Sequence, residues 1–118
     1  MTAAISFEGA SHQRYHYVLL DISAPQNLPR MSGNFLFARS GAEPEPIYIA
    51  EAESVHGAII SATEWADARL KYGATLFYFH PNFDSQKRKA EQIDLVARYD
   101  PPLNRSVVVR EERVRRLT

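Results

Sequence analysis

The 118-residue sequence contains no cysteine, which excludes a disulfide framework, a thiolate metal site and a cysteine nucleophile. No apolar run approaches the roughly 20 residues that a membrane helix needs. The first residues also lack the basic start and apolar segment of a signal peptide. From these absences we expect a cytoplasmic protein with no membrane partner.

The sequence also has no net charge, because 14 basic residues balance 14 acidic ones. This balance excludes a histone-like basic protein or an acidic tail protein, since neither would sum to zero. The charge is unevenly distributed: residues 1–60 sum to −3 and residues 61–118 to +3. Apolar residues make up 45% of the chain and aromatic residues 11%, which indicates one packed globular domain.

Several familiar catalytic motifs are missing. The sequence has no G-x-S-x-G elbow, no phosphate-binding glycine loop and no H-E-x-x-H helix. No two of the four histidines have the spacing of metal ligands on one helix. Two of them, His16 and His80, fall in predicted strands, where histidine is typically a half-buried structural residue.

Aromatic and β-branched runs predict four strands, over residues 15–20, 35–38, 47–50 and 75–80. The apolar run at 35–38 is typical of a strand buried on both faces, and it is expected to pair with 47–50 as a long-looped hairpin. Residues 1–14 are predicted to form a flexible N-terminus. Residues 105–118 form a basic C-terminal tail that is expected to add either an edge strand or a short helix.

Helical spacing and capping signals predict three helices between and after these strands. The apolar spacing after residue 55 favours a short first helix. A capping box from Ser61 to Glu64 begins the second, which ends before Gly73. The third and longest covers residues 84–99 and ends before Pro101. The fold class is therefore α+β, with a small, mainly antiparallel sheet flanked by helices.

Three segments together resemble one known family. Gly33-Asn34-Phe35 begins one predicted strand, Tyr48-Ile49-Ala50 lies in the next, and the segment from Glu91 to Asn104 combines a helix, two prolines and an asparagine. This arrangement resembles the GIY-YIG nuclease superfamily over residues 33–104. The resemblance implies a GIY-YIG-like domain over 15–104, with the strand at 15–20 as an addition at its N-terminal end.

The resemblance also implies roles for individual residues. Glu91 matches the glutamate that holds a single Mg²⁺ or Mn²⁺ in the family, and Tyr48 matches a tyrosine that positions the attacking water. Asn104 matches an asparagine that supports the site. A hard cation prefers carboxylate oxygen, and a phosphate being cut needs a fixed positive charge beside it.

Other family residues are replaced. Phe35 stands where the family has a tyrosine, and Ala50 where it has a glycine. The arginine position falls on Ala58, with His56 beside it as the nearest substitute and Arg69 as a more distant one. Losing one such transition-state donor typically costs roughly 3–4 kcal/mol. We therefore expect Tyr48, Glu91 and His56 to be vestigial catalytic residues, with no cofactor unless activity persists.

Nucleic-acid contacts are expected at basic residues outside the catalytic positions: Arg39, Arg69, Lys87, Arg88 and Lys89. The alternative is a solvated helix face, since Lys87 and Glu91 have i, i+4 spacing, as do Asp94 and Arg98. This alternative explains the same charges without a ligand.

Three functions follow from these observations. The first is a degenerate GIY-YIG-like domain that binds DNA, RNA or a protein partner without cutting. The second is an active metal-dependent endonuclease with an altered site. The third is a structural or interaction domain that contacts another protein through its C-terminal tail.

Overall fold

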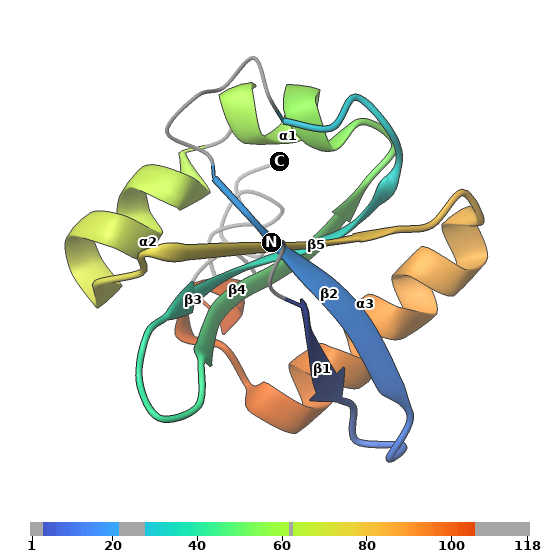
Figure 1. The fold of residues 1–118 in the computed structure, drawn as a ribbon, viewed down its shortest axis with the longest axis horizontal. Helices are drawn as coiled ribbons and strands as arrows, with labels where there is room; N and C mark the ends of the chain where they lie inside the picture. The colour runs from blue at the N-terminus through green and yellow to red at the C-terminus, as the bar shows by residue number, and fades with distance from the viewer. Residues whose placement is uncertain (1–3, 22–27, 62, 106–118) are drawn as a thin grey trace, which may run out of the picture.

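Five strands form one antiparallel sheet in the order β1-β2-β5-β3-β4 (Figure 1). The computed structural model describes residues 4–21, 28–61 and 63–105. The strands are β1 (Ala4–Glu8), β2 (Arg14–Leu20), β3 (Gly33–Arg39), β4 (Glu45–Ala52) and β5 (Leu76–Pro81). All neighbouring pairs are antiparallel, so the predicted α+β class with a mainly antiparallel sheet is confirmed.

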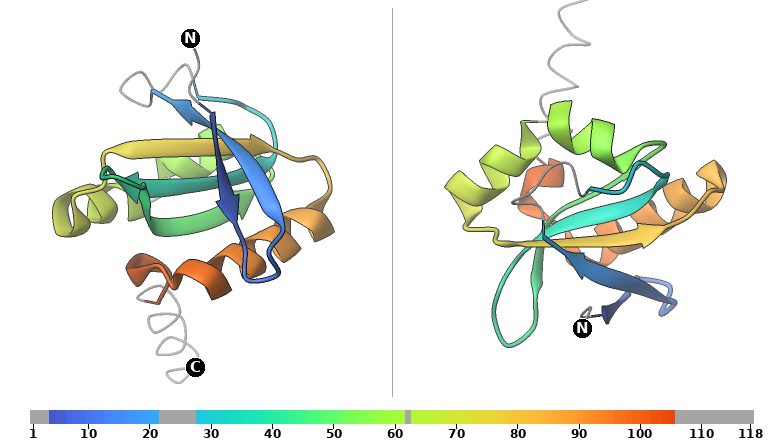
Figure 2. Two further views of the ribbon diagram at one scale, coloured as in Figure 1. Left: turned by 60° about the horizontal axis from the view of Figure 1, so that its bottom comes forward. Right: turned by 45° about the horizontal axis from the view of Figure 1, so that its top comes forward.

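Helices cover both faces of this sheet (Figure 2). Helices α1 (Val55–Ser61) and α2 (Glu64–Tyr72) pack on one face, and α3 (Ser85–Tyr99) packs on the other. The central strand β3 explains the arrangement, because Phe35 and Phe37 contribute to the core beneath α1 and α2, whereas Leu36 lies in the core beneath α3. A strand buried on both faces is what its continuous apolar run predicts.

The predicted hairpin of the second and third strands is confirmed. Strand β3 pairs with β4 from Gly33 opposite Ala52 to Arg39 opposite Glu45, with a register shift after Phe37. On its other side β3 pairs with β5, where Gly33 lies opposite Pro81. A Cβ added at Gly33 would lie 2.5 Å from the carbonyl oxygen of His80, so this close approach of β5 requires glycine.

The sequence correctly predicts the C-terminal end of α2 but not its N-terminal end. Gly73 follows the helix in the left-handed conformation with φ 71°, as predicted. The predicted capping box is wrong: Ser61 is the last residue of α1, and the N-cap of α2 is Thr63, which makes no side-chain capping bond. Two helices that meet within two residues leave no extended N-cap position for Ser61.

The longest helix, α3, matches its prediction closely. The side chain of Asp84 accepts hydrogen bonds from the backbone N–H groups of Gln86 and Lys87, which caps the first turn. The helix ends at Tyr99, and Asp100 takes a left-handed φ of 44° before Pro101. The chain then turns around the edge of the sheet, because Leu103 packs in the core beneath α1 and α2.

The prediction of a flexible segment over 1–14 is wrong for residues 4–8, which form the edge strand β1. Its Ile5 and Phe7 lie opposite Tyr17 and Tyr15 of β2, and the Phe7 side chain is buried. Figure 2 shows this hairpin crossing the other strands and reaching α3. The predicted C-terminal tail beyond residue 105 lies outside the described residues. Within those residues, no helix is both long and apolar enough to cross a membrane.

Candidate functional site

Four neighbouring strands place polar side chains in one row on the face that α3 covers. Asn34 of β3 lies opposite His80 of β5 on one side and Glu51 of β4 on the other. The rings of His80 and Tyr17, on β2, have centroids 5.5 Å apart. We call Tyr17, His80, Asn34 and Glu51 the polar row. Because polar groups are costly to bury without partners, these residues need groups from α3 to satisfy them.

Glu91 of α3 meets one end of the polar row. Its side chain is only 3% exposed. The Tyr17 hydroxyl donates a hydrogen bond to Oε2 at 2.5 Å, and Nδ1 of His80 lies 3.0 Å from both carboxylate oxygens. The alternative of a solvated i, i+4 pair with Lys87 is therefore wrong for Glu91. Its partners lie 74 and 11 residues away in sequence.

Arg88, three residues earlier on the same helix face, meets the other end of the polar row. Its Nε donates to Glu51 at 2.9 Å, and its Nη1 donates to the backbone carbonyl of Asn82 at 3.0 Å. The backbone carbonyl of Arg88 accepts from Nδ2 of Asn34. The Arg88 side chain is 3% exposed, so it belongs to a buried ion pair rather than to a basic surface. The expectation that it contacts nucleic acid is not met.

Burial and charge both shift the ionisation of the tyrosine in this cluster. Burial raises the pKa of Tyr17 well above its ordinary value, and the negative charge of Glu91 and the hydrogen bond to it act in the same direction. Tyr17 is thus a neutral donor to a carboxylate, an arrangement that holds Glu91 in one orientation.

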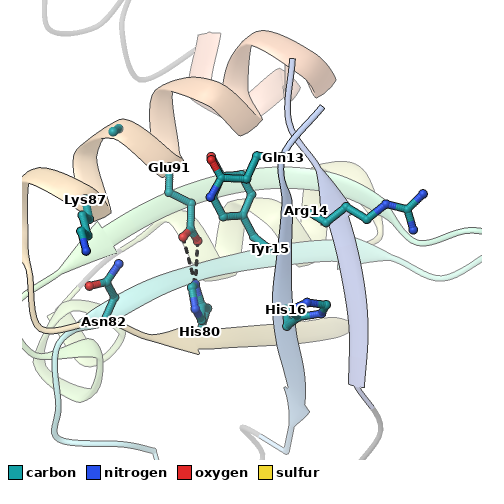
Figure 3. A pocket seen from close by; sticks show the side chains of 9 residues that line it. Gln13, Arg14, Tyr15, His16, His80, Asn82, Lys87 and Glu91 are labelled. Carbon is teal, nitrogen blue, oxygen red and sulfur yellow. Dashed lines mark hydrogen bonds and ion pairs between the residues drawn. The ribbon is translucent and has the colours of Figure 1, made fainter. Parts of the chain in front are cut away.

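A pocket of about 440 Å³ opens beside Glu91 and His80, between β2, β5 and the start of α3. Figure 3 shows Glu91 and His80 pointing toward each other at one side of it, joined by their hydrogen bonds. The polar and charged residues of its lining are Gln13, Arg14, Tyr15, His16, His80, Asn82, Lys87 and Glu91. Glu91 is the one acidic residue among them, and its charge is already engaged. The accessible groups of the pocket therefore favour an anionic or hydroxyl-bearing ligand.

Tyr48 does not join this site. It packs against the core on the α1 and α2 face, where its ring stacks on Phe37 with centroids 5.7 Å apart. Glu91 lies on the opposite face of the sheet, under α3. The convergence of Tyr48 and Glu91 that the resemblance implies is therefore absent.

His56 is also placed away from Glu91. It lies on α1, a helix that packs on the same face as Tyr48, and its backbone N–H donates to the carbonyl of Pro29. The sheet separates α1 from the carboxylate of Glu91. The structure thus does not bring His56 to the position where it would replace the family's arginine.

Asn104 has a clear supporting role for the edge strand. Its Oδ1 accepts from the backbone N–H of Ile49, and its Nδ2 donates to the carbonyl of the same residue, both at 2.8 Å. Gln92 also donates to that carbonyl. An edge strand leaves such groups unpaired, so Asn104 completes the hydrogen bonding of β4 and anchors the turn after α3.

Two of the remaining predicted bases, Arg39 and Arg69, lie at the α2 end of the molecule, where Nη1 of Arg39 donates to the backbone carbonyl of Tyr72. Arg39 is at the far end of β3 and pairs with Glu45. Arg69 lies over the ring of Trp65 on α2, with 5.5 Å between its guanidinium carbon and the ring centroid. Strand β3 spans roughly 20 Å between Arg39 and the end nearest the pocket. These two arginines therefore do not share a patch with α3.

Lys87 and Lys89 are exposed on the first half of α3. Lys87 lines the pocket and forms no ion pair with the other described residues. Of the five predicted bases, Lys87 is the one that the structure places at the pocket.

The divalent metal implied by the resemblance does not fit the surroundings of Glu91. Both carboxylate oxygens meet protein donors, the Tyr17 hydroxyl and Nδ1 of His80. Within residues 4–21, 28–61 and 63–105, no three His, Asp or Glu residues are grouped so that they could share an ion. A hard cation takes several oxygen ligands, whereas this buried carboxylate is surrounded by proton donors.

A second cluster joins the β1–β2 turn to α3 and holds one wall of the pocket. Asp94 accepts hydrogen bonds from the backbone N–H of Ser11, the Ser11 hydroxyl and the Tyr15 hydroxyl, at 2.6–2.8 Å. A Cβ on Gly9 would lie 2.1 Å from this carboxylate, so a side chain there would displace Asp94 from these hydrogen bonds. Burial, followed by the bond to Asp94, raises the pKa of Tyr15 to about 12.

This cluster predicts an acid-sensitive contribution to stability. The bond from the Ser11 hydroxyl, followed by that from Tyr15, lowers the pKa of Asp94. A lowered pKa stabilises the fold above the ordinary carboxyl range, and this contribution is lost as pH falls through the folded-state pKa. Asp94→Asn should reduce the free energy of unfolding by about 1 kcal/mol at neutral pH. In urea denaturation, the difference from the parent should shrink as the pH falls below the ordinary carboxyl range.

Asp67→Asn is the matched control for Asp94→Asn, because Asp67 forms only a long i, i+4 pair with Lys71 at 3.8 Å. Its effect should stay within about 0.5 kcal/mol. Equal effects of the two variants at neutral pH would contradict the role given to Asp94.

Sequence reasoning missed all four members of the polar row: Tyr17, His80, Asn34 and Glu51. Tyr17 lies in the strand outside the family resemblance, and His80 matched the pattern of a half-buried strand histidine. The signal that finds them is strand register, since His80 and Asn34 are direct cross-strand neighbours. In comparisons with known proteins, no family model matches the chain and no curated protein matches its sequence.

Proposed function

We propose that this chain is a GIY-YIG-like domain that binds single-stranded nucleic acid at the pocket between β2, β5 and α3, without metal-dependent cutting. The observation that carries the proposal is the pocket lining. It offers Lys87 and His80 to a ligand, while its one acidic group is buried and bonded. Arg14 and His16 also line it, but Arg14 pairs with Glu8 and His16 is bonded to the Ser6 hydroxyl. Such a lining suits the phosphate and sugar groups of a nucleic-acid backbone.

An exposed aromatic residue that follows a pocket residue in the chain supports a single-stranded ligand. Phe83 is 78% exposed and follows Asn82, which lines the pocket, in the turn between β5 and α3. Proteins that bind single strands combine cationic groups with aromatic rings on which bases stack. In a duplex the bases are already stacked on each other, so Phe83 favours an unpaired strand.

The loss of cutting rests on the separation of the family's catalytic positions. Glu91 is engaged with Tyr17 and His80, and Tyr48 lies on the other face of the sheet. The chain keeps the element order that the resemblance implies over residues 33–104. These observations support a binding role on a nuclease-like fold.

Fluorescence anisotropy with labelled single-stranded and duplex oligonucleotides tests the proposal. We expect single strands to bind more tightly than duplex, with affinity that falls as salt rises. Lys87→Ala should reduce the slope of log affinity against log salt by about 0.7, the contribution of one phosphate contact to a single strand. Phe83→Ala should weaken binding by about 1–2 kcal/mol through lost stacking.

Two residues of α2 provide matched controls. Lys71→Ala removes an exposed lysine, and Leu70→Ala removes a large side chain that is 80% exposed, both away from the pocket. Neither should change the affinity.

Cutting that depends on Mg²⁺ or Mn²⁺ and is lost in Glu91→Gln would show an active endonuclease instead. An absence of binding even at low salt would favour the protein-interaction domain.

A further inference from the structure

His80 presents one nitrogen to the carboxylate and leaves the other for the pocket. Its Nδ1 lies 3.0 Å from both oxygens of Glu91, and an ionised carboxylate only accepts hydrogen bonds. Nδ1 must therefore carry a proton. In the neutral ring Nε2 is then the nitrogen with the free lone pair, so it acts as an acceptor.

The surroundings fix this orientation of the ring. Tyr17 donates to Oε2 of Glu91 from the buried side, so the carboxylate cannot turn away from His80. Among the described residues, none forms a hydrogen bond to Nε2 of His80. The side chain is 28% exposed and lines the pocket. An oriented acceptor without a protein partner is thus available to a ligand.

A ligand that satisfies both His80 and Lys87 must bring a hydrogen-bond donor together with a negative charge. The ribose-phosphate backbone of RNA has this combination, because the 2′-hydroxyl donates and the adjoining phosphate is anionic. Deoxyribose lacks a donor at that place. We infer that the pocket selects RNA over DNA, with Nε2 of His80 accepting a hydrogen bond from a 2′-hydroxyl. This inference rests on the proposed function.

The test compares single strands of one sequence in one buffer at constant pH and ionic strength. The parent protein should bind RNA about threefold to tenfold more tightly than DNA, the effect of one hydrogen bond. RNA carrying 2′-O-methyl groups should lose this advantage, because methylation removes the donor. This comparison uses the parent protein alone, so it does not depend on how any variant folds.

Substitution of each pocket histidine then shows which residue is responsible for the preference for RNA. His80→Ala should bind RNA and DNA equally, with circular dichroism confirming that the fold is kept. His16→Ala is the matched control: it also lines the pocket, but its Nδ1 is bonded to the Ser6 hydroxyl. The preference for RNA should persist in that variant.

Two results would overturn the inference in different ways. Equal binding of RNA and DNA by the parent protein would exclude 2′-hydroxyl recognition while leaving nucleic-acid binding in place. Failure of both strands to bind at low salt would remove the proposed function as well. A preference for RNA that survives in His80→Ala would also contradict the role of Nε2.

Discussion

Replacing Arg88 with alanine is expected to destabilise the domain by about 3 kcal/mol. The guanidinium is buried between the carboxylate of Glu51 and the carbonyl of Asn82, and its removal leaves the Glu51 charge without a cation. Breaking a buried ion pair in this way typically costs about 3–5 kcal/mol. The lower end applies because the Glu51 side chain is 19% exposed and water can reach it. In calorimetry the midpoint of unfolding should fall by roughly 10 °C.

The neighbouring lysines on α3 provide the control for Arg88. Lys87→Ala and Lys89→Ala remove exposed positive charges from the same basic run and should change stability by less than about 0.5 kcal/mol. If Arg88→Ala were equally mild and weakened nucleic-acid binding instead, Arg88 would be a surface ligand as the sequence predicts. Arg88→Met combined with Glu51→Leu should recover most of the loss, because an apolar pair leaves no buried charge.

The parts of the fold that sequence predicts are those encoded by nearby residues. The run from Phe35 to Ala38 is apolar at every position, as a central strand is. Gly73 and Pro101 mark helix ends through their own backbone preferences. These signals need no knowledge of distant contacts, so β3, β4, β5 and α3 are all predicted close to their observed bounds.

Strand β1 depends on a partner and is harder to predict. Its sequence AISFE alternates apolar and polar residues, with Ile5 and Phe7 facing the core, but the pattern lasts only five residues. Pairing with β2 and the contact of the turn with Asp94 stabilise it. Short edge strands owe their order to such contacts rather than to intrinsic propensity.

In the candidate site, too, nearby residues predict some features while others depend on distant contacts. The sequence singles out Glu91 as a candidate, but helical spacing offers it Lys87 as a partner, whereas the fold supplies Tyr17 and His80. Likewise the run Lys87-Arg88-Lys89 reads as one basic patch, although successive residues of a helix point about 100° apart. Burial of the middle residue follows from the helix orientation on the sheet, which no local pattern specifies.

Replacing Glu91 with alanine should also cost about 3 kcal/mol. The change leaves the Tyr17 hydroxyl and Nδ1 of His80 without their acceptor in a buried place, and it removes packed side-chain volume beneath α3. Glu91→Gln keeps the shape and one acceptor oxygen, so it should cost less, about 1–2 kcal/mol. Urea denaturation of the two variants measures both values.

The Glu91 cluster also predicts how Tyr17 ionises. Because burial and the Glu91 charge raise its pKa, Tyr17 should ionise well above the ordinary tyrosine range in an ultraviolet titration. A raised folded-state pKa means that stability falls as pH rises above about 10, where the unfolded chain ionises first. In Glu91→Gln the charge is gone, so the Tyr17 pKa should move down while burial keeps it elevated. Tyr17→Phe should remove the part of the stability loss at alkaline pH that Tyr17 causes.

Mg²⁺ provides the decisive comparison for Glu91. A ligand that binds only the folded state raises the unfolding temperature, and the stabilisation grows with the logarithm of its concentration relative to Kd. If Glu91 held a divalent ion, Mg²⁺ would stabilise the parent protein and leave Glu91→Gln unaffected. Because Tyr17 and His80 already face both carboxylate oxygens, we expect Mg²⁺ to leave the two proteins unchanged at constant ionic strength. A shift confined to the parent would make Glu91 a metal ligand and would favour the active endonuclease over the binding domain.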